Sequence, residues 1–482
     1  MDVKIPEEVL SNVAARLGPD DLFNLRLTCR AFQANTFHEF ATEYFSSKCV
    51  HFTTDSLKSL VAITESKSLR PYLQEVFVCS KWFIEGLFDH NFCGCCPFKP
   101  PTKIAEAYRT FARDQLKLKI SGHDYLMLTK ILKNVQKLKR IGLVDNGDLL
   151  EHSVDYRGQR KVLRTAEFGP SASSPPPVDG YHEWLFHVFG TLLRAIKSSN
   201  VNVKSFTTSF THWPFALDVE HFKFKRTRTF RHLADTKFNT ITSLSLEFNL
   251  CDSAWSDITI IRRAGRSFPN VTDLAMYMNA DEAFESGRLV LGFLDGIGLA
   301  KLLRLTIVDT LCYYPDLKIA FKKLKSIQVL KLEGFGPLTE DLRDTWGELL
   351  GIIYNLESLQ HLHVIYPRQD GEKVWFLKDR TKAEIAAAAK STTSSHDPAS
   401  NHDKHDAEIY KRDFTNWAFP HDCGESITHK CNHGSIEQPR RGYYVCLPSK
   451  DDIKRLLPTF IDEVHDGYAA SDDVDDDNDD DE

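Results

Sequence analysis

The feature that most constrains the fold is a repeat of apolar residues through the middle of the chain. Apolar side chains recur at positions i, i+3 and i+5, and the middle residues of the last five triplets follow one another after 30, 31, 25 and 32 positions. Stretches of helical periodicity, such as 256–265 and 341–356, lie between the triplets. The triplets are Leu138/Ile141/Leu143, Ile241/Leu244/Leu246, Val271/Leu274/Met276, Leu302/Leu305/Ile307, Ile327/Leu330/Leu332 and Leu359/Leu362/Val364.

This repeat predicts a short strand and a helix in each unit. One such unit cannot bury its own apolar stripe, whereas stacked units share a continuous core. Weaker units lie at Leu73/Val76/Val78 and at Val203/Phe206. The alternative is an ordinary α/β sheet in which the spacing is coincidental.

A different pattern occupies the first forty-five residues. Pro6 is followed by two glutamates, a favourable opening turn for a helix that Gly18 ends. Pro19 begins a second predicted helix, and Thr36 with Glu39 has the spacing of a capping box for a third. Three helices of this length cannot bury their apolar side chains among themselves. We therefore expect the rest of the chain, or another protein, to cover them.

The composition indicates the size class of the protein and its cellular compartment. The chain has 482 residues, 42% of them hydrophobic, which allows two to four domains. It has no apolar run long enough to cross a membrane and no signal-peptide h-region at its start. Its eleven cysteines are an odd number and are scattered, as in a reducing compartment. We expect a protein of the cytoplasm, the nucleus or both.

Low-complexity stretches predict the borders between segments. The last twelve residues carry nine acidic side chains and no basic one, so that without them the net charge changes from −7 to +2. Such a tail stays solvated, either as a solubilising segment or as a docking segment. The predicted order is helices at 1–45, a repeat body at 46–376 with a loop insertion at 170–180, a flexible linker at 377–410, a small segment at 411–461 and a disordered acidic tail at 462–482.

Both ordered patterns resemble known families. The repeats resemble leucine-rich repeats, L-x-x-L-x-L-x-x-N, with Asn146, Asn249 and Asn279 at the asparagine position. The opening, Ile5-Pro6-x-Glu8-Val9-Leu10, then Leu17-x-Pro19-x-Asp21-Leu22, then Leu25-x-x-x-Cys29-Arg30-x-Phe32, resembles the F-box. Together with the acidic end, these features look most like fungal F-box proteins. The fold class expected is α + α/β: a three-helix F-box followed by an irregular leucine-rich-repeat solenoid.

The F-box resemblance implies a function. F-box helices bind the Skp-type adaptor of a Skp–cullin–F-box ubiquitin ligase, and the repeats hold a protein substrate that this sequence does not identify. For Val13 and Ala14 we favour packing among the helices themselves. The residues that the resemblance places against the adaptor are Ile5, Pro6, Leu10, Leu22, Leu25, Cys29 and Phe32.

Signatures of catalysis are absent from the sequence. It contains no phosphate-binding G-x-x-x-x-G-K-[ST], no G-x-G-x-x-G, no G-x-S-x-G and no H-E-x-x-H. We therefore expect no enzyme and no cofactor. The alternatives are an F-box scaffold that acts outside ubiquitination, and a metal- or nucleic-acid-binding protein whose F-box match is accidental.

Three further clusters have a functional and a structural interpretation. Cys93, Cys95 and Cys96 include one C-x₂-C pair, and the stretch from His421 to His433 alternates histidines and cysteines, but neither has the paired spacing of a structural zinc site. Residues 222–232 interleave cations with phenylalanines. That pattern fits a half-buried strand with its phenylalanines inward, a patch for an acidic peptide, or a nucleic-acid surface. We favour free cysteines for the first cluster, a polar loop for the second and a half-buried strand for the third.

Overall fold

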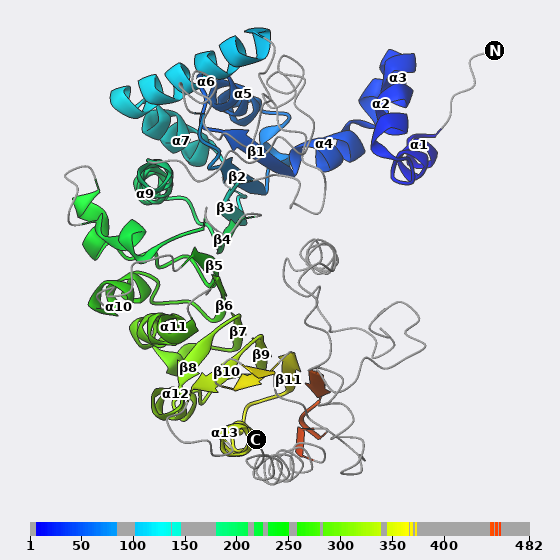
Figure 1. The fold of residues 1–482 in the computed structure, drawn as a ribbon. Coiled ribbons are helices and arrows are strands. Elements are labelled where there is room, and N and C mark those ends of the chain that lie inside the picture. The colour runs from blue at the N-terminus through cyan, green and yellow to red at the C-terminus, as the bar shows by residue number, and fades with distance from the viewer. Residues whose placement is uncertain are drawn as a thin grey trace, which may run out of the picture. The chain divides into compact units, whose positions relative to one another are not determined.

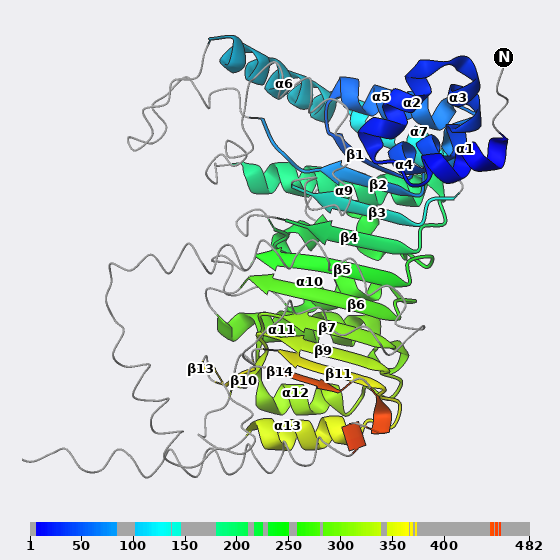
Figure 2. The ribbon, with the colours of Figure 1, turned by 90° about the vertical axis from the view of Figure 1, so that its right-hand side faces the viewer.

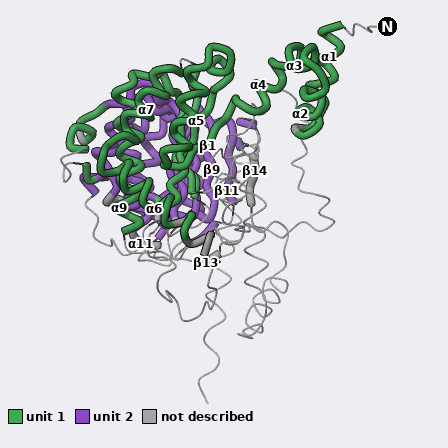
Figure 3. The backbone as a smooth tube through the Cα atoms, turned by 90° about the horizontal axis from the view of Figure 1, so that it is seen from above, with its two compact units in different colours: residues 1–216, 223–236 green, residues 217–222, 237–482 purple. Residues whose placement is uncertain are grey.

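The computed structural model describes residues 6–83, 102–135, 137–145, 180–210, 216–224, 230–249, 258–279, 283–338, 345–365, 367–369, 372–373, 444–447, 449–451 and 453–454. The chain divides into two compact units (Figure 3). Unit 1 comprises residues 1–216 and 223–236, and unit 2 comprises residues 217–222 and 237–482. Among the described residues, no helix is both long and apolar enough to span a membrane.

Unit 1 begins with helices and continues with a parallel sheet (Figure 1). Its strands pair in the order β1–β2–β3–β4, each parallel to the next. Its elements are α1 (Glu7–Ala14), α2 (Pro19–Thr28), α3 (Arg30–Asn35), α4 (Phe37–Phe45), β1 (Ser47–His51), α5 (Thr54–Glu65), the 3-10 helix η1 (Arg70–Tyr72), β2 (Glu75–Cys79), α6 (Thr102–Ser121), α7 (His123–Asn134), β3 (Arg140–Val144), α9 (Tyr181–Ser199), β4 (Ser205–Ser209) and the 3-10 helix η7 (Arg231–Asp235).

The sheet of unit 1 is buried on both faces at β2 and β3. Val76, Ile141 and Phe206 lie side by side in register and are fully buried, as the weaker repeat units predict. On the opposite face Phe77 and Val144 are also buried. Strands covered on both sides read as nearly continuous apolar runs, which explains sequences such as VFVC and IGLV.

Burial of His51 makes unit 1 sensitive to acid. Desolvation, with a smaller contribution from the charge of Lys81, lowers the pKa of His51 to about 3. In the unfolded chain the pKa of a histidine is about 6.5. As the pH falls below 6.5 the unfolded state therefore takes up a proton that the folded state does not, and stability is lost.

We expect the free energy of unfolding of unit 1 to fall by about 1 kcal/mol between pH 6.5 and pH 5.5 because of His51. Urea unfolding of the wild type and of His51→Phe at both pH values measures it. The variant keeps an aromatic ring beside Phe83, whose centroid is 6.2 Å from that of His51, and removes the titration. An equal loss in both proteins would contradict this account of His51.

Unit 2 alternates strands with helices that follow one another along the sheet. Each of α10 to α13 contacts the next, and Figure 1 shows them along one side of its strands. Its elements are the 3-10 helix η5 (Val219–Phe222), β5 (Ser243–Asn249), α10 (Ile258–Arg266), β6 (Asp273–Asn279), α11 (Ala283–Ile297), the 3-10 helix η8 (Leu299–Lys301), β7 (Arg304–Val308), β8 (Leu311–Tyr313), α12 (Tyr314–Phe321), β9 (Val329–Glu333), β10 (Gly336–Leu338), α13 (Thr345–Tyr354), β11 (His361–Ile365), β12 (Arg368–Gln369), β13 (Glu372–Lys373) and β14 (Tyr444–Leu447).

The apolar triplets of the sequence become the core of unit 2. Strands β5, β6, β7, β9 and β11 pair in that order, all parallel, and Figure 2 shows them side by side. The second members of the five triplets face one another in register, and so do the third members. Every member of these triplets is at most 2% exposed. The prediction of a mixed helix and strand body with a parallel sheet is confirmed.

The N-terminal helices differ in number from the prediction. Four helices, not three, span Glu7–Phe45, because Cys29 adopts an extended backbone and separates α2 from α3. The predicted capping box at Thr36 is wrong. The hydroxyl of Thr36 donates to the carbonyl of Phe32 at 2.7 Å and makes no cap to α4, and the carboxylate of Glu39 accepts from Ser11 instead.

The interleaved stretch at 222–232 is interpreted correctly in part. Phe222, Phe224 and Phe230 are at most 7% exposed, as the inward-facing interpretation predicts. The predicted strand is wrong at both ends, because Phe222 ends the 3-10 helix η5 and Arg231 begins the 3-10 helix η7. Lys225, Arg226 and Arg228 lie outside the described residues, as does most of the loop insertion at 170–180.

Several other predictions fall outside the described part of the chain. They concern Cys93, Cys95 and Cys96, the stretch from His421 to His433, the linker at 377–410 and the acidic tail. Asn146 also lies outside it, and so do the side chains of Asn249 and Asn279. Within the described residues, no group of three or more histidines, cysteines or carboxylates is placed to hold a metal ion. The predicted segment borders stay predictions.

Candidate protein-binding surface

The surface considered as a candidate site lies on α1 and α2, whose boundaries follow from local chemistry. Gly18 precedes α2, and Pro19 with two aspartates opens it. Cys29 both ends α2 and caps α3, where its Sγ accepts a hydrogen bond from the backbone nitrogen of Phe32 at 3.5 Å. This break turns the chain after ten residues, so that α3 packs back against α2.

Arg26 ties the helices together. Its Nη1 donates to the carbonyl of Gln33 at 2.8 Å and to Oγ1 of Thr36 at 3.2 Å. The guanidinium also lies 4.0 Å from the ring centroid of Phe40, a cation–π contact. Partial burial lowers the pKa of Arg26, and the charge of Glu39 opposes that shift. A charged group on α2 thereby connects α3 and α4 and fixes the position of the α2 surface.

The helices bury a small apolar core of their own. Leu10 is 5% exposed, Ala14 2% and Leu22 3%. Leu10 and Ala14 are four residues apart on α1 and so lie on one side of it. The prediction that Ala14 packs internally is confirmed.

A second set of apolar side chains remains exposed. Val9 is 49% exposed and Val13 44%, so the prediction that Val13 packs internally is wrong. On α2, Phe23 is 49% exposed and Leu27 69%. Each helix therefore presents one pair of large apolar residues at i and i+4, which places the two members of a pair on the same side. Exposed apolar side chains in such groups mark surfaces that bind other proteins.

The seven residues assigned to the adaptor surface divide by burial. Pro6 and Cys29 are exposed, and Leu25 and Phe32 are half-buried. Leu10 and Leu22 are buried within the chain, so they have little remaining surface to give to a partner. Ile5 lies outside the described residues. Which of the seven contact an adaptor stays a prediction.

Phe23 and Leu27 were missed because motif matching gave them no weight. The signal was nonetheless present in the sequence PDDLFNLRLT, where Leu22, Phe23, Leu25 and Leu27 cover more than one side of a ten-residue helix. The neighbouring helices α3 and α4 cover only part of this helix, and Phe23 and Leu27 stay exposed. The uncovered side is therefore available to a partner.

Comparison with known families decides what this helical segment is. Residues 3–34 match the model of the F-box domain. The chain carries an F-box. The match covers α1, α2 and most of α3, and the resemblance is therefore not accidental.

Other comparisons add little to the F-box match. No curated protein is similar enough to this chain to count as a relative. Among solved structures, the chain is similar to one in the "Crystal structure of Rad7 and Elc1 complex in yeast". The two are 12% identical, the match covers 74% of this chain and 75% of that one, and the TM-score is 0.27.

Proposed function

We propose that this F-box protein is the substrate-recognition subunit of a Skp–cullin–F-box type ubiquitin ligase, in the cytoplasm, the nucleus or both. It would bind a Skp-type adaptor through the N-terminal helices and a target protein through the body. The observation that carries the proposal is the exposure of Val9, Val13, Phe23 and Leu27 within the F-box match. An F-box is expected to present an apolar surface to its adaptor.

Energetics favour a partner for these helices. Fully burying one large aliphatic or aromatic side chain contributes roughly 1.5–3 kcal/mol. Two such residues on α2 alone can anchor an interface, since a few central residues usually carry most of the binding energy. Leu10 and Leu22 would act indirectly, by holding α1 and α2 in the arrangement that presents this surface.

For the body we propose leucine-rich repeats whose polar strand face receives the target. In support, the second and third members of the apolar triplets occupy one face of the strands of unit 2, and the alternate residues occupy the other face. That other face carries the register row Ser243, Asp273, Arg304, Val329 and His361, which contains both charge signs. Such a face can discriminate among protein surfaces by charge and hydrogen bonding.

The proposed mechanism is proximity. A receptor that holds a target near a charged ubiquitin-conjugating enzyme raises the effective concentration of the target's lysines. It needs no nucleophile, general base or cofactor of its own. The proposal is therefore that the protein is not an enzyme.

We expect the double variant Phe23→Gln, Leu27→Gln to bind a purified Skp-type adaptor at least 30-fold more weakly than the wild type. The expected loss is about 2 kcal/mol, because two exposed anchors lose their apolar contacts. Glutamine is a good helix former, so α2 should stay folded. Titration calorimetry with the full chain measures the affinity, and circular dichroism checks the fold.

Two further variants make the test specific. Ile319→Gln changes a residue on α12 that is 57% exposed, and it should leave adaptor binding unchanged. Leu22→Ala should lower the stability of the helices by about 2–3 kcal/mol. If the folded double variant binds the adaptor as tightly as the wild type, α2 is not the binding surface. If the folded wild type does not bind at all, the proposed function is wrong.

The scaffold alternative predicts the same adaptor binding but a different outcome in cells. A substrate-recognition subunit causes one or more proteins to accumulate when it is deleted, and restoring the wild-type chain but not the Phe23→Gln, Leu27→Gln variant lowers their level again. A scaffold that acts outside ubiquitination changes no protein half-life. Quantitative measurement of protein turnover distinguishes the two.

A further inference from the structure

The strands of unit 1 begin at one edge of its sheet, and the loops before them lie side by side there. The backbone nitrogen of Gln74 donates to the carbonyl of Ser46 at 2.8 Å, and that of Lys139 donates to the carbonyl of Gln74 at 2.7 Å. The backbone nitrogen of Lys204 continues this row to the carbonyl of Lys139 at 3.2 Å. The loops ahead of β2, β3 and β4 therefore form one continuous surface. The segments that contribute to it are 64–75, 130–140 and 196–205.

Positive charge is concentrated on this surface. Its three segments contain nine basic and two acidic residues. Both acids are already paired: Glu65 lies 2.6 Å from Lys130, and Glu75 lies 3.5 Å from Arg140. We call six of the remaining cations the basic edge. Within the described residues they have no ion pair or side-chain hydrogen bond, and all are exposed except one half-buried arginine: Lys67, Arg70, Lys133, Lys137, Lys139 and Lys197.

Stability of the helices accounts for only two of these cations. Lys133 and Lys197 lie in the last turns of α7 and α9, where positive charge stabilises a helix. Lys67, Lys137 and Lys139 lie in the loops instead, where like charges on neighbouring loops repel one another. Exposed like charges without a stabilising role inside the chain favour a bound anion.

The residue types of the basic edge favour an acidic polypeptide over a nucleic acid or a membrane. Five of its six members are lysines, whereas the planar fork of arginine suits phosphate groups best. The aromatic residue of the three segments is Tyr72. Its ring packs edge-on against Phe37 with centroids 6.0 Å apart, and its hydroxyl lies 3.2 Å from Nδ1 of His38, so it is not available to stack on a base. Among the described residues, the strongly exposed large apolar side chains all lie outside these segments, which leaves no group here to insert into a membrane.

The spacing of the strands sets the length of the ligand. Neighbouring strands lie about 4.8 Å apart, so the starts of four strands span roughly 15 Å. An extended chain advances about 3.3 Å per residue, so about five residues cover the edge. The carboxylates of such a segment can approach the ammonium groups without burying apolar surface.

We propose that the basic edge binds an acidic segment of a partner protein, rich in aspartate and glutamate and about five residues long or longer. Contacts of this kind contribute more to specificity and to the rate of association than to affinity, and salt weakens them. The inference does not rest on the proposed function, because it requires neither an adaptor nor a ubiquitin ligase. It assigns this edge of unit 1 to an interaction separate from that of the exposed side chains on α1 and α2.

Binding of an acidic peptide to the full chain tests the proposal. The probe is a fluorescein-labelled peptide of about ten alternating aspartates and glutamates, followed by fluorescence anisotropy at about 0.1 M salt. We expect the wild type to bind this peptide and not to bind its amide analogue, in which asparagine and glutamine replace the acids. The triple variant Lys67→Glu, Lys137→Glu, Lys139→Glu should bind the acidic peptide at least tenfold more weakly.

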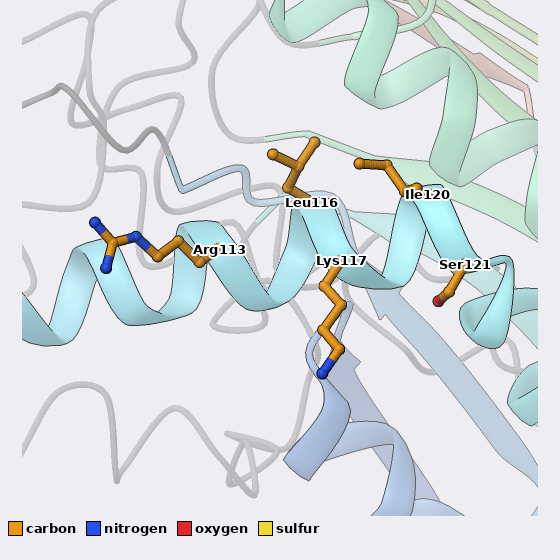
Figure 4. Close-up of a pocket in the computed structure, with 5 residues that line it drawn as sticks. All are labelled: Arg113, Leu116, Lys117, Ile120 and Ser121. Carbon is orange, nitrogen blue, oxygen red and sulfur yellow. The ribbon is translucent and has the colours of Figure 1, made fainter.

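A second triple variant makes the same change in net charge elsewhere. Lys58→Glu, Lys117→Glu and Lys322→Glu replace exposed lysines on α5, on α6 and at the end of α12, and should weaken peptide binding less than twofold. Lys117 samples a different surface of unit 1. Figure 4 shows it on α6 with the exposed Leu116 and Ile120, and together they line part of a shallow open hollow of about 380 Å³.

Because all the substituted lysines are exposed, both triple variants should keep the circular dichroism spectrum of the wild type. If the charge reversal unfolds the chain, a milder variant replaces it. Lys67→Gln, Lys137→Gln, Lys139→Gln removes the three charges without reversing them, and it should bind the peptide at least threefold more weakly than the wild type.

Three results would overturn the proposal. The first is a folded wild type that does not bind the acidic peptide. The second is an equal loss of binding in the two glutamate variants, which would reduce the effect to net charge. The third is tighter binding of duplex DNA or of vesicles containing phosphatidylserine than of the peptide, lost in the variant of the basic edge. That result would assign the edge to a nucleic acid or to an anionic membrane surface.

Discussion

Replacing Gly296 by alanine is expected to lower the free energy of unfolding of unit 2 by about 2–4 kcal/mol. Gly296 on α11 lies against Arg262 and Gly265 on α10, and a methyl group built on it would come within 2.2 Å of the carbonyl oxygen of Arg262. This oxygen belongs to the backbone of α10, so it cannot rotate away as the end of a side chain could. The two helices would have to separate, which strains or opens a packed core.

Two opposing effects decide the sign of this prediction. Alanine is a better helix former than glycine by about 1 kcal/mol, which would stabilise α11. The forced separation of α10 and α11 costs more, because both helices cover the buried face of the strands. Urea unfolding and the melting temperature measure the result.

A glycine elsewhere in unit 2 provides a matched control. Gly351 lies within α13, and a methyl group built on it would have no neighbouring atom within 4 Å. Gly351→Ala should therefore be neutral or stabilising by up to about 1 kcal/mol. If Gly296→Ala proved as stable as Gly351→Ala, the close contact between α10 and α11 would not be as described here.

Replacing Asp124 by alanine is expected to destabilise unit 1 by about 2–4 kcal/mol. The Oδ2 of Asp124 lies 2.6 Å from Nε2 of His187, which connects α7 to α9, and the Asp124 side chain is only 1% exposed. The rings of Phe52, Trp184 and Phe230 surround His187 with centroid distances of 5.7–6.3 Å. Removal of the carboxylate leaves the imidazole in these apolar surroundings without this partner.

An exposed ion pair on the same helix serves as the control. Lys130 on α7 lies 2.6 Å from Glu65, but both side chains are at least half exposed. Surface pairs of this kind contribute about 0–1 kcal/mol, so Lys130→Ala should have little effect. Asp124→Asn, which keeps a polar side chain of the same size, should cost less than Asp124→Ala. Equal losses for Asp124→Ala and Lys130→Ala in urea unfolding would show that the buried contact contributes no more to the free energy of unfolding than the exposed ion pair does.

The parallel sheet of unit 2 could be predicted from the sequence because its signal is local and repeated. Leu244, Leu274, Leu305, Leu330 and Leu362 are each the middle of a short apolar triplet, and the near-constant step puts them in one register. The F-box could be predicted for a related reason. Its residue types and spacings lie within a single continuous stretch of about thirty residues.

Other features depend on contacts that the local sequence does not contain. The spacing of Leu10, Val13 and Leu22 is helical in each case, yet two of these side chains are buried and Val13 is exposed. The capping box at Thr36 was wrong because Phe32 and Arg26 engage its hydroxyl first. The bond to Phe32 is a local alternative four residues back, whereas the bond from Arg26 comes from another helix and is not visible in the spacing of Thr36 and Glu39.

What the sequence by itself determined was the alternation of strands and helices in the repeat body, the register of the apolar triplets and the F-box. Periodicity and motif spacing settle these, because they are properties of neighbouring residues. Only the tertiary structure decided that α6 keeps Leu116 and Ile120 exposed, that Asp124 meets His187, and that Gly265 and Gly296 let two helices touch. Each of these depends on which side of an element meets its neighbour, and helical spacing fixes the sides of a helix but not what covers them.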